Sequence, residues 1–326
     1  MTQSKSYNGK YFKLELLSQE KLADGTAKLK IHSEDTYSRR RYALERRAVA
    51  IFSGSLNRYL RKRPHIKHDS RRNLARTLVY LSPAVKAWAQ YMPGGFATYH
   101  VHNPKRLHLL SGKKIDYIAK ILFRHSVDGQ GLRSRAYAMT WFIKNKTAKH
   151  DKLNWLSVAC GTGQPTFDAA SEIGGNVNFY FVDDDARALE FAEDLSVEYG
   201  ISKNKIEFKK INAISGIDKL DTYAQSVQPN VIDAMGIFEY LQPDDAVNLL
   251  KVLYDRLDKD GVLVFTNMLP DHPHLHLHQR GLGWPGVIQR ETKTMRALIK
   301  KAGIPLEKLS VILPDDQVYA VYGVVK

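Results

Sequence analysis

The stretch Leu156-Ser-Val-Ala-Cys-Gly-Thr-Gly-Gln-Pro-Thr-Phe167 decides the fold of this chain. Its first residues predict a buried strand, and two glycines one residue apart, Gly161 and Gly163, follow that strand. Glycine permits a tight turn and lets a ligand lie against the backbone. Pro165 suits the first turn of a helix. A strand, a glycine turn and a helix in this order indicate a ligand-binding turn of an α/β fold.

The next acidic residue in the pattern narrows the class of ligand. Asp183 ends the following predicted strand, twenty residues after Gly163, and its carboxylate is placed to accept hydrogen bonds from ribose hydroxyls. A dinucleotide site would have a third glycine where Thr166 stands, and Pro165 removes an amide donor that a diphosphate would use. Both changes are tolerable for a ligand with a methionine tail and no phosphate.

The second half of the chain alternates between strand and helix patterns. Predicted strands cover residues 155–159, 178–182, 206–211, 231–236 and 262–267. Short apolar strands separated by helices imply a parallel sheet with both faces covered. Two last strands, 309–313 and 318–325, are joined by a turn so short that they must be antiparallel. The prediction for residues 151–326 is therefore an α/β domain with a Rossmann-like, seven-stranded sheet, mostly parallel with a C-terminal antiparallel hairpin.

Residues 1–150 have a different character. They carry 31 Lys and Arg against 9 Asp and Glu, whereas the rest of the chain is net acidic. A small hairpin is expected around Asp24-Gly25, a helical pattern begins near Ser38, and Gly129-Gln-Gly131 predicts a loop before another helix. We expect a basic, mostly helical N-terminal domain. Its charge favours an anionic partner, either nucleic acid, a lipid headgroup or an acidic small molecule, or else forms a solvated surface.

The composition also bears on location. No stretch approaches the ~20 apolar residues of a membrane-spanning helix, and the first residues lack the apolar run of a signal peptide. Cys160 is the single cysteine, so no internal disulfide exists. A cytoplasmic protein is expected.

On these residues, the segment 151–326 resembles the class I S-adenosylmethionine-dependent methyltransferases. Val158-Ala-Cys-Gly-Thr-Gly163 is similar to the family's first motif, whose backbone wraps the methionine part of the donor. Val182-Asp-Asp-Asp-Ala-Arg-Ala-Leu189 is similar to the second motif, which implies that Asp183 holds the ribose and that Asp184 lies beside the adenine. The cofactor implied is S-adenosyl-L-methionine.

Later segments continue the resemblance. Ile211-Asn-Ala213 stands where the family often has an Asp-Ala pair that reaches the adenine amino group, so Asn212 keeps polarity but loses charge. The segment from Val231 to Leu241 matches the fourth motif, beneath the transferred methyl group. Gly236-Ile-Phe-Glu-Tyr-Leu241, with Trp284 and Arg290, is similar to a largely uncharacterised bacterial subgroup. The donor residues implied are Ala159, Gly161, Gly163, Asp183, Asp184, Asn212, Ala213 and Gly236.

Candidate residues around the reacting groups follow from the same resemblance. In this fold the helix before the first strand often covers the donor, so Arg133, or Arg135 by the same chemistry, is expected to pair with the donor's carboxylate. The alternative is that both charges are solvated at the surface. Transfer is expected to be direct and in line, since the sulfonium is already electrophilic and the protein mainly orients the reactants. Glu239 and Tyr240 are the candidate catalytic residues if the acceptor must lose a proton; the alternative is local bonding and packing.

The run Asp271-His-Pro-His-Leu-His-Leu-His278 raises the question of a metal. Four histidines at a spacing of two would share one face of a strand, which could chelate a cation. Pro273 and the lack of nearby cysteine or well-spaced carboxylates argue against this. We expect no metal site, but a solvent-exposed loop or a loop with one histidine in the acceptor pocket.

The acceptor expected is a small or lipid-like molecule. The alternatives are an RNA or DNA methyltransferase and a non-catalytic nucleic-acid-binding protein with a degenerate cofactor fold; the basic half with Tyr42, Tyr59 and Tyr80 favours them. Two observations argue against methylation of a base. The Asn/Asp-Pro-Pro-aromatic motif of amino-base methylation does not follow the fourth strand. Cys160, the single cysteine, lies in the loop expected to bind the donor, so it is not placed to act as a nucleophile on cytosine C5. Peripheral contact with a membrane is a further expectation for the basic half.

Overall fold

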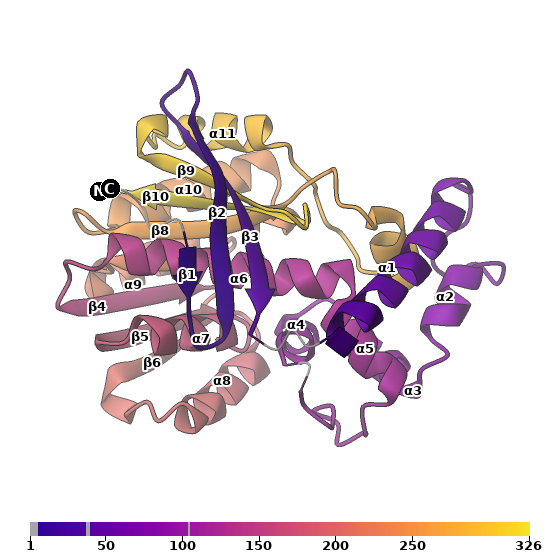
Figure 1. Cartoon of the computed structure of the whole chain (residues 1–326). Helices are drawn as coiled ribbons and strands as arrows, with labels where there is room; N and C mark the ends of the chain where they lie inside the picture. Colours follow the sequence, from indigo (N-terminus) through magenta and orange to yellow (C-terminus); the bar gives the residue numbers. More distant parts are fainter. Residues whose placement is uncertain (1–5, 37–39, 104) are drawn as a thin grey trace.

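A computed structural model of the chain describes residues 6–36, 40–103 and 105–326, and one mixed sheet runs through it (Figure 1). The order of its ten strands is β1-β2-β3-β9-β10-β8-β7-β4-β5-β6. They are β1 (Ser6–Asn8), β2 (Phe12–Lys21), β3 (Ala27–Asp35), β4 (Lys152–Val158), β5 (Asn176–Asp183), β6 (Ile206–Lys210), β7 (Val231–Ala234), β8 (Val262–Met268), β9 (Leu309–Pro314) and β10 (Tyr319–Val325).

Strands β4 to β10 have the predicted arrangement. Strands β4 to β8 pair in parallel, β10 is antiparallel to β8, and β9 is antiparallel to β10. The predicted number of strands, seven, is wrong, because β3 pairs in parallel with β9 and adds the hairpin β2–β3 and the short β1 to the same sheet. Leu29 and Ile31 of β3 are fully buried in the core of that sheet. The strands of residues 6–35 therefore belong to this sheet, so strands lie on both sides of the expected boundary at residue 150.

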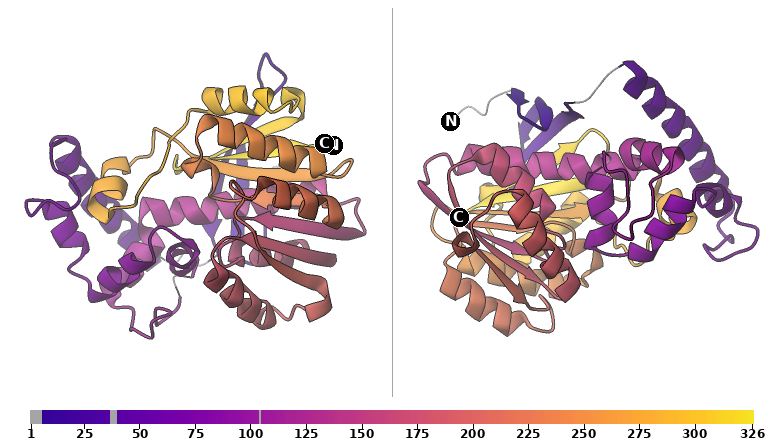
Figure 2. Two further views of the ribbon diagram at one scale, coloured as in Figure 1. Left: turned by 180° about the vertical axis from the view of Figure 1, so that it is seen from behind. Right: turned by 90° about the horizontal axis from the view of Figure 1, so that it is seen from below.

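Helices cover both faces of the sheet, as the right-hand view of Figure 2 shows. One face packs against α6 (Val127–Lys146), α7 (Gln164–Ile173) and α8 (Ala186–Glu198). The other face packs against α9 (Ile217–Val227), α10 (Pro243–Arg256) and α11 (Thr292–Lys301). This burial explains the near-continuous apolar character of the central strands.

A separate group of helices lies beside the sheet (Figure 1). It contains α1 (Arg40–Arg61), α2 (Leu74–Val79), α3 (Pro83–Trp88), α4 (Gly95–His102) and α5 (Tyr117–His125). The segment after β8 joins it through one π-helical turn, η4 (Leu277–Leu282), which packs on α1 and α2. We call this assembly the helical group; it has its own apolar core. The predicted helical start near Ser38, with Arg39, lies outside the described residues.

The start of α6 differs from the prediction. Gly129 and Gly131 lie inside the helix, not in a loop before it. A Cβ atom on Gly131 would lie 2.4 Å from Cβ of Val318, so glycine there lets α6 pass close to the residue before β10. Tertiary packing thus selects these glycines, and their local preference for loops is overridden.

Candidate active site

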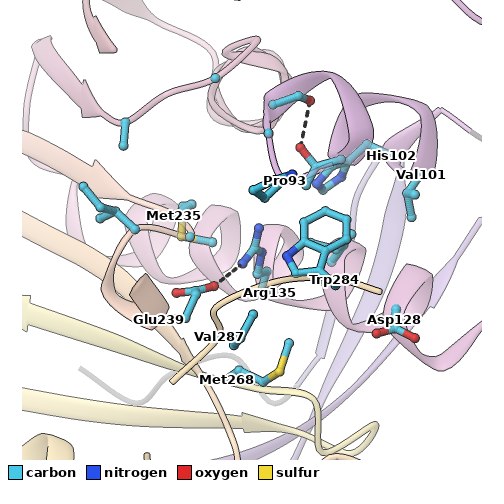
Figure 3. A pocket seen from close by; sticks show the side chains of 18 of the residues that line it. Pro93, Val101, His102, Asp128, Arg135, Met235, Glu239, Met268, Trp284 and Val287 are labelled. Carbon is cyan, nitrogen blue, oxygen red and sulfur yellow. Dashed lines mark hydrogen bonds and ion pairs between the residues drawn. The ribbon is translucent and has the colours of Figure 1, made fainter. Parts of the chain in front are cut away.

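A cavity of about 650 Å³ lies between the helical group and the loops that follow β4, β5 and β7 (Figure 3). Open α/β sheets hold their ligands at these strand ends. Nine predicted site residues line the cavity: Ala159, Gly161, Asp183, Asp184, Asn212, Ala213, Gly236, Glu239 and Tyr240. The structure thus brings together residues that are up to 81 positions apart in the sequence. Gly163 and Arg133 do not line the cavity.

The loop after β4 has the tight turn expected of it. Ala159, Gly161 and Gly163 all have positive φ angles, of 51°, 55° and 67°. A Cβ atom on Gly161 would lie 3.0 Å from Cα of Gly95 in α4, so the helical group approaches the loop backbone directly. Gly95 was not predicted as part of the site. Gly95 ends the run Pro93-Gly94-Gly95, whose composition indicates a break in the chain and gives no sign of a binding site.

Asp183 supports this loop from the end of β5. One carboxylate oxygen accepts a hydrogen bond from the amide of Gly161 at 2.7 Å, and the other accepts from the amide of Asp185 at 3.0 Å. Burial raises the pKa of the Asp183 carboxyl above its usual value. Each carboxylate oxygen has further acceptor capacity, so the group can brace the turn and still accept a hydroxyl from a ligand.

Asp184 and Asn212 meet at the next strand end. Nδ2 of Asn212 donates to Oδ2 of Asp184 at 2.9 Å. Oδ1 of Asn212 accepts the amides of Ile214 and Ser215, which orients the side chain. The two residues that the resemblance assigned to one adenine are therefore neighbours in space, and both face the cavity.

A buried carboxylate, Asp233 in β7, was not predicted. It accepts hydrogen bonds from Nε1 of Trp155 at 2.7 Å, Oγ of Ser157 at 3.0 Å and Oγ1 of Thr166 at 3.1 Å. Burial raises its pKa to about 6, although these three donors act in the opposite direction. The signal in the sequence was an acid inside an otherwise apolar strand, Val231-Ile-Asp-Ala234. The Asp233 carboxylate therefore links β7 to β4 and to α7, the two elements that flank the glycine loop.

Glu239 forms a buried ion pair with an arginine of α6. Nη1 of Arg135 lies 3.2 Å from Oε1 of Glu239, and the two side chains are only 7% and 4% exposed. Figure 3 shows them pointing toward each other across the cavity wall. Oε2 of Glu239 has no hydrogen-bond partner among the described residues. The Arg135 guanidinium also lies over the ring of Tyr319, 4.4 Å from its centroid.

Tyr240 has a different environment. Its hydroxyl accepts a hydrogen bond from Nε1 of Trp284 at 2.7 Å, and burial raises its pKa to about 12. The loop that carries Glu239 and Tyr240 is held by Arg290, whose guanidinium donates to the carbonyl groups of Phe238 and Leu241. Trp284 and Arg290, noted in the sequence only for a resemblance, thus fix the two candidate catalytic residues.

Arg133 lies on the opposite side of α6 from the cavity. Its guanidinium donates to the carbonyl oxygens of Val101 and Phe123 and pairs with Asp35 at 3.3 Å. It lines a second cavity, of about 710 Å³, near β2 and α7. Arg135, two residues further on, lines the first cavity instead. The structure therefore does not bring Arg133 close to the other residues that are predicted to bind the methyl donor.

The histidine run is not an exposed strand or loop. Its second part is helical, and His272 and His278 are buried. Both approach Asp128 in the first turn of α6, and His274 and His278 line the cavity. The four histidines thus do not share one face. Asp128, His272 and His278 form a cluster whose donor atoms lie within 4.8 Å of one another.

Apolar side chains form the rest of the cavity wall, on the side of the helical group. They come from α1, α2, α3, α5, α6, the end of β8 and the segment after it. The residues are Phe52, Leu56, Val79, Val85, Trp88, Leu122, Phe123, Leu132, Met268, Leu277, Leu282, Trp284 and Val287. One cavity therefore has a polar end at the strand loops and an apolar end in the helical group.

Comparison with known families and structures gives one family and a fold. Residues 97–321 match the model of a family described as "Putative methyltransferase". No curated protein matches the chain. A possible exported protein from Bordetella parapertussis has a similar structure, with a TM-score of 0.57 and 15% identity over 72% of this chain and 79% of that one. The magnesium protoporphyrin IX methyltransferase of Synechocystis with bound S-adenosylhomocysteine has a TM-score of 0.50 and 12% identity over 74% and 98%.

Proposed function

Because this chain belongs to the family described as "Putative methyltransferase", it is a methyltransferase of the S-adenosylmethionine-dependent class, and we propose that its acceptor is a small, largely apolar molecule. The observation that carries this proposal is the continuity of the cavity that nine of the predicted site residues line. This cavity runs from the polar loops after β4, β5 and β7 into a compartment walled by apolar side chains of the helical group. Burial of apolar surface is the main driving force for a ligand in such a compartment.

The polar end suits the donor. The loop backbone at Gly161 lines the cavity, and a side chain at this position would meet the backbone of α4. In the proposal the loop 159–163 holds the methionine part, Asp183 accepts from the ribose, and Asp184 with Asn212 lies beside the adenine. Arg135, not Arg133, reaches the donor's carboxylate. The bound donor supplies an electrophilic methyl group on a sulfonium.

The residues of this chain then act mainly by orientation. Glu239 is held in its ion pair, so its first role is to fix Arg135 at the wall of the cavity. Tyr240, with a pKa of about 12, keeps its proton at neutral pH and serves better as a polar contact than as a base. Both residues line the cavity next to Met235 and Gly236, which follow β7.

The test is a transfer of label. Purified protein with methyl-labelled S-adenosylmethionine is incubated with a cell extract, which is then split into RNA, DNA, lipid and small-molecule fractions. We expect label in the small-molecule or lipid fraction. Label in nucleic acid alone would overturn the proposed acceptor class.

The cavity argues against a nucleic-acid acceptor. Among the described residues that line it, Arg135 is the only Lys or Arg, and it is paired with Glu239. A polyanion that enters the site would need several cationic contacts. The basic side chains of α1 that are exposed lie outside this wall: Arg41, Arg47, Arg58 and Arg61.

For this basic surface we expect weak and unselective binding of polyanions. Each phosphate contact adds about 0.9 to the slope of log affinity against log salt for duplex DNA. An anionic membrane offers about 1 kcal/mol per basic residue, and none of the described helices is long and apolar enough to cross a bilayer. Two salt titrations, with RNA or DNA and with anionic vesicles, separate these partners. Tight, sequence-selective binding of nucleic acid at physiological salt would contradict the expectation.

We also expect methyl transfer to survive exhaustive dialysis against a chelator, because transfer from a sulfonium needs no Lewis acid. The measurement is incorporation of label before and after dialysis. Loss of all turnover, with recovery on addition of a divalent metal, would instead make the histidine cluster a metal site. A cytoplasmic location stays a prediction.

A further inference from the structure

Asp128 lies between two buried histidines at the apolar end of the cavity. Nε2 of His272 is 3.2 Å from Oδ1 of Asp128, and Nδ1 of His278 approaches the same oxygen. The side chains of His272 and His278 are 0% and 5% exposed. Figure 3 shows Asp128 beyond Trp284 as seen from the Arg135–Glu239 pair. The cluster is therefore distinct from the predicted catalytic residues, although Asp128 and His278 line the same cavity.

The hydrogen bonds determine which nitrogen of His272 carries a proton. The backbone N–H of His274 donates to Nδ1 of His272 at 2.9 Å, so Nδ1 has a lone pair. A neutral imidazole has one donor and one acceptor nitrogen. Nε2 of His272 therefore carries the proton and donates it to Asp128. A protonated Nε2 cannot ligate a metal, which separates this cluster from a metal site in the observed arrangement.

The same reasoning applies to His278. Oδ1 of Asp128 accepts a hydrogen bond from Nε2 of His272, and Nδ1 of His278 approaches the same oxygen. An ionised carboxylate only accepts hydrogen bonds, so Nδ1 of His278 is the donor. In the neutral ring, Nε2 of His278 then has the lone pair. This is the arrangement in which a carboxylate sets the tautomer of a histidine.

Nε2 of His278 has no hydrogen-bond partner among the described residues, although it is buried. Its ring stacks on Trp284, with centroids 5.7 Å apart, and Trp284 in turn is bonded to Tyr240. A buried acceptor without a donor is costly, and such groups in native structures call for an explanation. A ligand in the cavity that donates a hydrogen bond would satisfy it.

We propose that Asp128 and His278 form a recognition site for a hydroxyl or N–H group of the acceptor molecule, which donates to Nε2 of His278. The proposal rests on the proposed function and specifies its substrate class: a largely apolar molecule with one such donor. The site determines specificity, because an analogue without the hydroxyl or N–H group would leave Nε2 of His278 buried without a hydrogen bond, which weakens its binding. Neither Glu239, paired with Arg135, nor Tyr240, bonded by Trp284, supplies this contact.

The first test needs no acceptor. Long-range ¹H–¹⁵N spectra of histidine-labelled protein report the tautomer of each ring. We expect Nδ1–H for His278 and Nε2–H for His272, with the His278 assignment lost in Asp128→Leu and kept in Asp271→Leu, which alters an exposed acid in the same region. Nε2–H on His278, or a shift of both rings on addition of Zn²⁺ alone, would overturn the proposal.

The second test uses a probe pair, 2-naphthol and its methyl ether 2-methoxynaphthalene, with protein saturated with S-adenosylhomocysteine. We expect naphthol to bind about tenfold more tightly than the ether. The preference should vanish in His278→Phe and persist in His276→Phe, which changes a histidine outside the cluster. Equal binding of the two probes, or no binding of either, would overturn the inference. Binding of S-adenosylhomocysteine itself, measured first, separates this failure from failure of the proposed function.

Discussion

Asp183→Ala is expected to weaken binding of S-adenosylhomocysteine by about 1.5–3 kcal/mol, which is roughly ten- to 150-fold in Kd. The substitution removes the proposed acceptor for the ribose hydroxyls. It also removes the acceptor for the amides of Gly161 and Asp185, so the turn around Gly161 loses its support. Calorimetric titration measures the change. Asp194→Ala, an exposed acid on α8, is the matched control and should bind as the wild type does.

Gly161→Arg should have the larger effect, with binding too weak to measure at the same concentrations. Its φ of 55° disfavours any side chain, and the backbone of Gly95 lies where the Cβ atom would go. An arginine there must displace α4 or fill the cavity. Circular dichroism would establish that the variant is folded. If Asp183→Ala and Gly161→Arg both bind like the wild type, the donor site is wrongly assigned.

Arg135→Met is expected to lower the free energy of unfolding by about 3–5 kcal/mol, because it leaves the Glu239 carboxylate buried without its partner. Burial already raises the pKa of Glu239, and Arg135 is the neighbour that most opposes this. The variant also loses the contact of the guanidinium with the Tyr319 ring. Urea unfolding followed by circular dichroism measures the change.

The double variant Arg135→Met/Glu239→Leu is the control for this interpretation. Replacing both members of a buried ion pair by apolar residues is often neutral, so we expect most of the stability to return. Arg187→Met, in an exposed pair with Asp185, should change stability by less than about 1 kcal/mol. If the double variant loses as much free energy of unfolding as Arg135→Met, the loss is not caused by an unpaired Glu239 carboxylate.

The part of the site that could be predicted depends on short-range rules. A glycine turn after a strand, an acid at the end of the next strand and a polar residue after the third all lie at strand ends, and parallel strands bring these ends to one edge. The proximity of Gly161, Asp183 and Asn212 could therefore be predicted without knowledge of any other contact. The antiparallel end of the sheet followed in the same way, because a short turn leaves no other pairing for its two strands.

The remaining features depend on contacts between distant segments. Arg133 and Arg135 are two residues apart on one helix, so they project about 200° apart, and only the packing of α6 decides which one faces the cavity. The cluster of Asp128 with His272 and His278 forms only once the segment after β8 lies against α6. The pairing of β3 with β9 joins residues such as Ala27 and Ser310, which are 283 positions apart, and it has no local signal.

A crystal structure of the protein with S-adenosylhomocysteine would locate the donor directly. We expect the ribose at Asp183, the adenine beside Asp184 and Asn212, and the sulfur facing the apolar end of the cavity, where Trp284 and the helical group form the wall. A ligand in the second cavity beside Arg133, or one whose sulfur faces away from the helical group, would contradict the proposed donor site.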